Sequence, residues 1–194
     1  MDNYSDNNNN LFNPEFAEHG YIQVYTGNGK GKTTASLGLA MRALGRGWKV
    51  LIVMFTKGGN DYGELVSFSN LCSDYKDNVK IIQAGLDRIV YSTNVSEDDK
   101  MQVQKGWEIA KEAIQLDKYQ LIILDEANIA LDLGLISLND MIDTLKNKPD
   151  KTEIVLTGRN AKPEIIKIAH LVSEIIPVKH YWDKGVTARK GIEY

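Results

Sequence analysis

A run of glycine, lysine and threonine residues near the start of the chain has the composition of a phosphate-binding loop. Glycines let the backbone turn so that several N–H groups point at one anion. In such a loop Lys32 is predicted to reach the phosphates, and the Thr33 hydroxyl is predicted to ligate Mg²⁺. The residues predicted to bind the phosphates are Thr26, Gly27, Asn28, Gly29, Lys30, Gly31, Lys32, Thr33 and Thr34.

One position of this loop departs from the usual spacing, which is glycine, four residues, and then Gly-Lys-Ser/Thr. Thr26 stands where the first glycine is normally found. The context still agrees with a phosphate loop, because a β-rich segment at 21–26 precedes it and apolar residues at helical spacing follow it over 33–46. The loop then lies at a helix N-terminus, whose dipole favours anions. A glycine-rich turn without nucleotide function is the disfavoured alternative.

A second nucleotide element is an apolar strand predicted at 121–124, which is followed directly by Asp125 and Glu126. Coordination of Mg²⁺ requires an acidic side chain at the carboxyl end of such a strand, usually acting through water. Asp125 is therefore predicted to hold the metal shell together with Thr33. Glu126 has two interpretations, a base for attack by water or a group that positions substrate. The residues alone predict binding of a Mg-nucleoside triphosphate and leave its fate open.

The elements that must position these residues alternate between strands and helices along the chain. Strands are predicted at 21–26, 50–55, 79–84, 121–124, 154–157 and 171–176. Helices are predicted at 33–46, after Glu64, from Ser96 to about 116, from Ser137 to about 147, and after Pro163. Ser96 with Asp99 resembles a capping box at the start of its helix. This alternation implies an α/β protein with a mostly parallel sheet of about six strands and helices on both faces. Together with the phosphate loop and the acidic strand end, it leads us to expect a P-loop NTPase (RecA-like) fold. Ligands of such sheets bind beyond the carboxyl ends of the strands.

Composition narrows the class of protein. The 194 residues carry a formal net charge of −3, which disfavours a broad nucleic-acid-binding face. The single cysteine, Cys72, excludes an internal disulfide and fits a reducing compartment. No apolar run approaches the roughly 20 residues that a membrane span needs. We therefore expect a cytoplasmic protein with neither nucleic acid nor membrane as a partner.

The first residues differ in composition from the rest of the chain. Residues 1–13 are rich in asparagine and offer little to bury, so we expect a disordered or partner-docking tail, followed by a single domain over 14–194. Leu11, Phe12 and Phe16 could dock on a second subunit, which favours a homodimer.

Several motifs in one order resemble the ATP:corrinoid adenosyltransferases of the P-loop bacterial type. The resemblance covers nearly all of the chain from Gly20 onward. The C-terminal motif is especially characteristic. The matching segments are 27–34, 57–58 with 62–64, 124–128, 157–159, 178–180, 183–186 and 188–194.

The resemblance implies an unusual use of the phosphate loop. Members transfer the 5′-deoxyadenosyl group of ATP to the Co(I) centre of a reduced corrinoid and release triphosphate, in the synthesis or salvage of adenosylcobalamin. The corrinoid, either cob(I)yrinic acid a,c-diamide or cob(I)alamin, is the co-substrate, and a flavoprotein is the implied reductant. Lys32, Lys30, the loop amides and Mg²⁺ would neutralise the leaving triphosphate. A P-loop ATPase that hydrolyses ATP to ADP and phosphate is the alternative function.

The resemblance also places side chains at the rim of the site. By analogy Glu64, Glu126, Asn128 and Arg159 belong there, and Lys32 and Glu126 are the predicted catalytic residues. Family members often carry a Gly-Phe-Thr-Trp type segment after the third strand, whose aromatic residues pack against the corrin. This chain departs from that pattern with Leu86, which can still pack on a corrin face, and with Arg88, which is not an aromatic wedge. Either Tyr91 or Ile89 packs against the corrin in its place, or the corrinoid is handled differently.

Overall fold

A six-stranded parallel sheet forms the centre of the protein, and its strand order is β3-β2-β4-β5-β1-β6. The computed structural model describes residues 18–70, 75 and 77–194, so the expected tail at 1–13, together with Leu11, Phe12 and Phe16, lies outside the described residues. The strands are β1 (Ile22–Thr26), β2 (Val50–Phe55), β3 (Val79–Ala84), β4 (Leu121–Asp125), β5 (Glu153–Thr157) and β6 (Leu171–Glu174).

The strands follow the expected pattern closely, and the bounds of β2 and β3 coincide with the prediction. All six residues of β2 are buried, as an unbroken apolar run predicts for a parallel strand covered on both faces. Asp125 is the last residue of β4 rather than the first residue after it. The sixth strand is shorter than expected and ends at Glu174, and all four of its residues are exposed.

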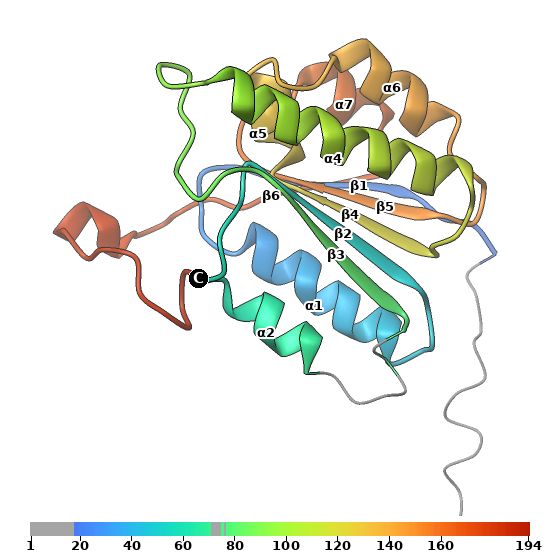
Figure 1. Cartoon of the computed structure of the whole chain (residues 1–194), viewed down its shortest axis with the longest axis horizontal. Helices are drawn as coiled ribbons and strands as arrows, with labels where there is room; N and C mark the ends of the chain where they lie inside the picture. Colours follow the sequence, from blue (N-terminus) through green and yellow to red (C-terminus); the bar gives the residue numbers. More distant parts are fainter. Residues whose placement is uncertain (1–17, 71–74, 76) are drawn as a thin grey trace, which may run out of the picture.

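Helices cover both faces of the sheet, as predicted. Figure 1 shows α1 and α2 on one face and α4, α5, α6 and α7 on the other. The helices are α1 (Lys32–Leu44), α2 (Gly63–Ser69), α4 (Glu97–Gln115), α5 (Ala127–Asp132), α6 (Leu138–Lys146), α7 (Pro163–Ile168) and the 3₁₀ helix η2 (Tyr181–Lys184).

Alternate side chains of the central strands feed two apolar clusters, one on each face. Ile52 and Met54 of β2 join a cluster that contains Leu44 of α1. Val53, which points to the opposite side of the same strand, joins the cluster around Trp107 of α4. The Trp107 side chain is fully buried. Since successive side chains of a strand point to opposite faces, one strand stabilises both layers.

Local sequence signals set the helix bounds. Ser96 accepts a hydrogen bond from the Asp99 backbone N–H and the Asp99 carboxylate accepts one from the Ser96 backbone, so the predicted capping box is confirmed. Ser137 caps α6 in the same position. Helix α1 ends at Leu44, two residues earlier than predicted. The sequence did not predict α5 or η2, because elements of six and four residues show no helical periodicity and these two, unlike α7, do not begin at a proline.

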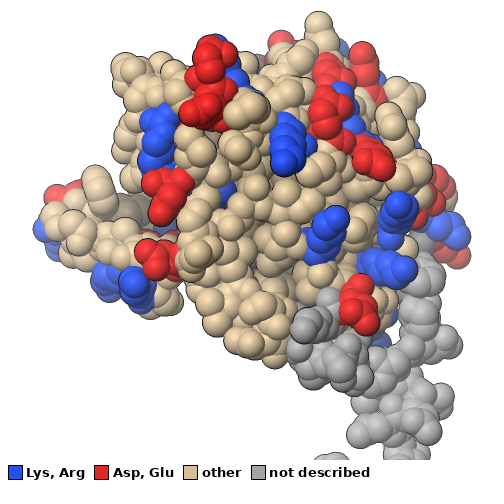
Figure 2. Space-filling model, in the orientation of Figure 1, with Lys and Arg blue, Asp and Glu red and all other residues tan. Residues whose placement is uncertain are grey.

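The segment that follows β6 leaves the sheet, forms η2 and returns to end beside the start of α2 (Figure 1). Lys190 Nζ lies 3.5 Å from Asp61 Oδ1 in the loop before that helix. On the face drawn in Figure 2, acidic and basic side chains interleave over the surface. Among the helices of the described residues, none is long and apolar enough to cross a membrane.

Candidate active site

The predicted site residues converge at the edge of the sheet where the parallel strands end. The phosphate loop joins the end of β1 to the start of α1, and Asp125 ends β4. Strand β5 lies between these two strands in the sheet and contributes Thr157 at its own end. Side chains that are some 90 residues apart in the chain thus meet in one place, as the fold class predicts.

The phosphate loop packs against the end of β6. Gly29 donates its backbone N–H to Ile175 O at 2.7 Å. A Cβ added to Gly29 would lie 2.7 Å from the same oxygen, so this position requires glycine because of a close backbone approach. The sequence predicted that several loop amides point at the anion, and in this structure the Gly29 amide bonds instead to the segment after β6.

Lys32 is folded into the loop that it follows. Its Nζ donates to Gly27 O and to Gly29 O, each at 2.8 Å, and the residue is 8% exposed. Burial lowers the pKa of this ammonium, and the nearby Glu126 carboxylate offsets part of that effect. The loop is therefore already closed around a cation that would face the phosphates of a nucleotide.

The two predicted magnesium ligands lie in direct contact. Thr33 Oγ1 donates to Asp125 Oδ1 at 2.8 Å, and Asp125 is fully buried. Thr157 Oγ1 donates to the same carboxylate oxygen at 2.6 Å and accepts from the Glu126 N–H at 3.0 Å. Thr157 was not predicted as a site residue, and the available signals were its position at the end of an apolar strand and its place in the family-like segment 157–159.

Lys57 is the second residue that sequence reasoning missed. Its Nζ lies 2.6 Å from Asp125 Oδ2 and 3.3 Å from Thr33 Oγ1. Burial lowers the pKa of Lys57, but the Asp125 and Glu126 carboxylates outweigh burial and raise it. The register of the sheet explains the contact, because Met54 of β2 pairs with Asp125 of β4 and Lys57 follows just after β2.

Glu126 and Asn128 line the same edge at the start of α5. Glu126 has a φ of 57°, a left-handed conformation that is uncommon for a residue with a side chain. Burial and the charge of Asp125 raise the pKa of its carboxyl. Asn128 is fully buried and donates through Nδ2 to Gly158 O at 3.1 Å, while its Oδ1 has no hydrogen-bond partner.

Glu64 and Arg159 lie at the rim of this edge. Glu64 is half-buried in the first turn of α2, and its charge acts on the pKa of Lys57. Arg159 is exposed after β5, and its charge acts on Lys32 and Glu126. Every residue predicted for the site thus belongs to the strand-end edge or to its rim.

The C-terminal segment returns to the phosphate loop through Lys30. Lys30 Nζ donates to Ile192 O at 2.6 Å and lies 3.3 Å from the Glu193 carboxylate. Glu193 also accepts hydrogen bonds from Tyr181 and Arg189, and these bonds, from Tyr181 first, lower its pKa to about 2. The characteristic C-terminal motif is therefore attached to the loop that would bind the nucleotide.

The loop after β3 carries Arg88 where the resemblance leads us to expect aromatic residues, and Arg88 contacts the start of α4. Arg88 Nη2 donates to Asn94 O and Ser96 Oγ, each at 3.1 Å, and pairs with the Asp99 carboxylate. Arg88 thus ties the loop to the N-terminus of α4. Ile89 and Tyr91 are 71% and 59% exposed beside it.

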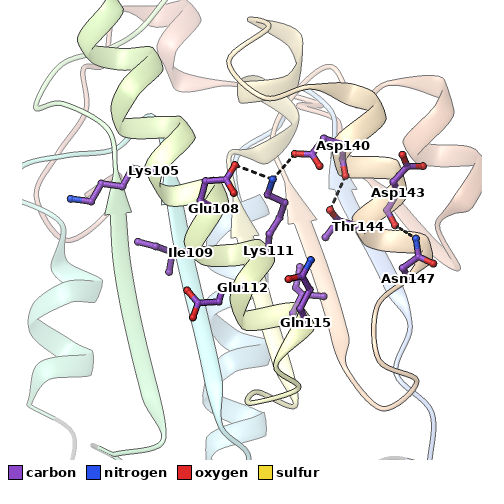
Figure 3. A pocket seen from close by; sticks show the side chains of 11 residues that line it. Lys105, Glu108, Ile109, Lys111, Glu112, Gln115, Asp140, Asp143, Thr144 and Asn147 are labelled. Carbon is purple, nitrogen blue, oxygen red and sulfur yellow. Dashed lines mark hydrogen bonds and ion pairs between the residues drawn. The ribbon is translucent and has the colours of Figure 1, made fainter.

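A separate groove of about 690 Å³ lies between α4 and α6, away from the strand-end edge (Figure 3). Lys111 bridges Glu108 and Asp140 across it, each at 2.9 Å. The predicted site residues do not line this groove, and its charged pairs face solvent. The chemistry-bearing side chains therefore lie elsewhere.

The donor set at the strand-end edge fits a magnesium ion bound together with a nucleotide. A hydroxyl and a carboxylate, Thr33 and Asp125, offer the hard oxygen ligands that Mg²⁺ prefers. Within the described ranges, no group of three or more His, Cys, Asp or Glu side chains could hold a metal. A Mg²⁺ ion here would take its remaining ligands from phosphate and water, as Mg²⁺ usually does.

A parallel sheet with a glycine-rich loop before α1 and an acidic residue ending β4 defines a P-loop nucleotide-binding protein of RecA-like fold. The fold is shared with the flagellar accessory protein FlaH of Methanocaldococcus jannaschii. The TM-score is 0.53 at 15% identity, covering 80% of this chain and 71% of that chain.

The family can be assigned from sequence comparison. Residues 18–194 match the family described as ATP:corrinoid adenosyltransferase BtuR/CobO/CobP. The corrinoid adenosyltransferase of Escherichia coli (strain K12) is 35% identical over 177 residues, which cover 91% of this chain and 87% of that protein. The chain belongs to this family, whose members transfer the adenosyl group of ATP to a corrinoid.

One relative is considerably longer than this chain. Uncharacterized protein all2391 of Nostoc sp. (strain PCC 7120) is 39% identical over 180 residues, which cover 89% of this chain. The match covers 48% of that protein, so the chain spans about half of its length.

Proposed function

We propose that this protein transfers the 5′-deoxyadenosyl group of MgATP to the Co(I) centre of a reduced corrinoid and releases triphosphate. The electron pair of Co(I) attacks C5′ and forms the Co–C bond, while the C5′–O bond breaks and its electrons leave with the triphosphate. The observation that carries the proposal is the meeting of Lys32, Thr33 and Asp125 at one edge, in a chain of this family.

The chemistry asks the protein to hold ATP and to neutralise its leaving group, because Co(I) is itself the nucleophile. The buried ammonium of Lys32 and the half-exposed one of Lys30 would bind the polyphosphate. Mg²⁺, held by Thr33 and Asp125, would supply further positive charge to the departing triphosphate. Fixing the nucleotide with C5′ exposed converts the transfer into an effectively unimolecular step.

Glu126 serves in this proposal to position the substrate rather than to activate water. Its carboxyl is buried beside Asp125, which raises its pKa, and its backbone N–H is held by Thr157. Asn128 Oδ1, a buried acceptor without a partner, is a candidate contact for the nucleotide or its metal shell. Glu64 and Arg159 complete the rim.

The corrinoid would bind against the loop after β3. Ile89 and Tyr91 present exposed apolar surface there, which suits a corrin face, and the half-buried Leu86 adds to it. Arg88 is committed to the cap of α4, so it holds the loop rather than contacting the corrin. We therefore assign the packing role to Ile89 and Tyr91.

The partners of the reaction follow from the same chemistry. A separate reductant, a flavoprotein by resemblance, would supply Co(I), and the cytoplasm is the proposed compartment. We propose a homodimer in which Leu11, Phe12 and Phe16 dock on a second subunit. The edge strand β6 supports it, because its four residues are exposed and an exposed edge can pair with another chain.

The products of one reaction test the proposal. The protein is incubated with MgATP and chemically reduced cobalamin, and the visible spectrum and the phosphate products are recorded. Adenosylcobalamin with intact triphosphate is the expected result. ADP and phosphate formed without corrinoid would instead identify an ATPase in which Glu126 activates water.

A further inference from the structure

Lys57 occupies the place where a metal ion would be expected. Its ammonium contacts both predicted magnesium ligands, Asp125 Oδ2 at 2.6 Å and Thr33 Oγ1 at 3.3 Å. These two side chains also bond to each other at 2.8 Å, so the three groups form a closed triangle. A cation of the protein itself thus holds the metal ligands together.

The backbone turn after β2 places Lys57 for this contact. Thr56, between β2 and Lys57, has a φ of 56°, which turns the backbone sharply at the strand end. Gly58 follows, and an added Cβ there would lie 2.4 Å from Gly85 O, so the turn packs backbone against backbone. Lys57 is thereby aimed at the neighbouring strand end of β4.

The surroundings keep the ammonium in place. Asp125 is fully buried and the Lys57 side chain is 16% exposed, so the pair is shielded from water. The Tyr62 ring lies under the ammonium, with its centroid 5.8 Å from Nζ. A metal ion bound to the same carboxylate would lie close to the ammonium, and two cations at such distances repel each other strongly.

We propose that Lys57 is a placeholder cation, which stabilises Asp125 and Thr33 in the nucleotide-free protein and yields its position when Mg²⁺ arrives with the nucleotide. The negative charge of the polyphosphate then accommodates both cations, whereas free Mg²⁺ alone must compete with Lys57. Lys57 is in this sense a positioning residue that makes metal binding depend on the nucleotide. The inference rests on the proposed MgATP site.

Metal binding without nucleotide tests this directly. Mn²⁺, a paramagnetic substitute for Mg²⁺, is titrated into nucleotide-free wild type, Lys57→Met and Lys80→Met, and free Mn²⁺ is measured by electron paramagnetic resonance. Lys80 is an exposed lysine of β3 and serves as the matched control. Lys57→Met is expected to bind Mn²⁺ roughly tenfold or more tightly than wild type, because no competing cation remains. An affinity equal to or below that of wild type would overturn the proposal.

Thermal unfolding gives a second readout. Lys57→Met without metal is expected to unfold at a lower temperature than wild type, because Asp125 loses its cation. Adding Mn²⁺ is expected to raise the unfolding temperature of Lys57→Met by more than it raises that of wild type. No recovery by Mn²⁺ would contradict the placeholder role.

A measurement on wild type covers the case in which Lys57→Met does not fold. Wild type should hold Mn²⁺ weakly alone and much more tightly with inorganic triphosphate present. An affinity for Mn²⁺ that triphosphate leaves unchanged would contradict the proposal. Adenosyl transfer is not measured in any of these experiments, so this inference and the proposed function can fail separately.

Discussion

The two substrate sides of the site are built in opposite ways. On the phosphate side, Lys32, Thr33 and Asp125 are joined by hydrogen bonds at the buried ends of β1 and β4. On the proposed corrinoid side, Ile89 and Tyr91 are 71% and 59% exposed in the loop after β3. The first side is fixed by the sheet before any ligand binds, and the second depends on local contacts between this loop and the start of α4.

This difference matches the chemistry of the two proposed substrates. A polyphosphate presents dense charge in a fixed pattern, and a buried, prearranged set of donors binds it without reorganisation. A corrin presents a broad apolar face, for which exposed side chains on adjustable segments are sufficient. Changes on the phosphate side should therefore slow the transfer or cost stability, and changes on the other side should affect corrinoid binding while leaving ATP binding unchanged.

The largest expected effect follows Asp125→Ala. The change leaves the Lys57 ammonium buried without its counter-ion, and losing one partner of a buried pair costs about 3–5 kcal/mol in the free energy of unfolding. Denaturant unfolding measures the loss, with Asp143→Ala on the surface of α6 as the matched control. A loss no greater than that of the control would show that the phosphate side is not held by this pair.

Lys32→Ala is expected to slow adenosyl transfer by roughly two orders of magnitude or more, because it removes the cation nearest the leaving triphosphate. The rate of Co–C bond formation is followed by the visible spectrum with ATP in excess. Lys49→Ala is the control, since this exposed lysine precedes β2 at the opposite edge of the sheet. Near-normal turnover of Lys32→Ala would contradict the placement of ATP.

Arg88→Ala is expected to act on the corrinoid side alone. It releases the loop after β3 from Ser96 and Asp99, and ordering such a segment again on binding costs about 1 kcal/mol, or roughly fivefold in the KM for the corrinoid. The affinity for ATP, measured by calorimetry, should not change. The exposed Arg46 offers a matched control as Arg46→Ala. A loss of ATP affinity would show that the two sides are not independent.

The smallest effect concerns the pH dependence of the α4 cap. Burial raises the pKa of Asp99, but hydrogen bonds from Ser96 and the charge of Arg88 outweigh burial, so that its pKa lies below the ordinary 3.8. The stability that Asp99 contributes is therefore fully present above pH 3.8 and is lost as the pH falls through the lower folded value.

Thermal unfolding of wild type and Asp99→Asn over a pH series measures this contribution. The difference between the two proteins should be constant at neutral pH and shrink at acid pH. A difference that grows as the pH falls would have the wrong sign for a depressed pKa.

The sequence predicted the phosphate side better than the other contacts. The apolar runs of β2 and β4 and the loop before α1 are local patterns, and they located Lys32, Thr33 and Asp125 correctly at one edge. The capping box at Ser96 was local in the same way. Such patterns are carried by a few adjacent residues, so they can be recognised without knowing which distant segments pack together.

The sequence did not predict contacts that depend on how distant segments pack together. Lys57 meets Asp125 only through the register of β2 on β4, and Lys30 meets Glu193 only through the return of the C-terminal segment. The left-handed backbone of Glu126 also has no signature, because that conformation is normally a property of glycine or asparagine. The available hints were a lysine two residues after a fully buried strand and its place in the family-like segment 57–58.

The most direct test of the central claim asks which bond of ATP breaks. ATP carrying ¹⁸O at the oxygen between C5′ and the α-phosphate is incubated with Mg²⁺, reduced cobalamin and the protein, and the products are examined by mass spectrometry. If the phosphate side holds ATP with C5′ open to Co(I), the label leaves with triphosphate and the adenosylcobalamin carries none. Label retained in ADP, with cleavage at phosphorus, would contradict this mechanism.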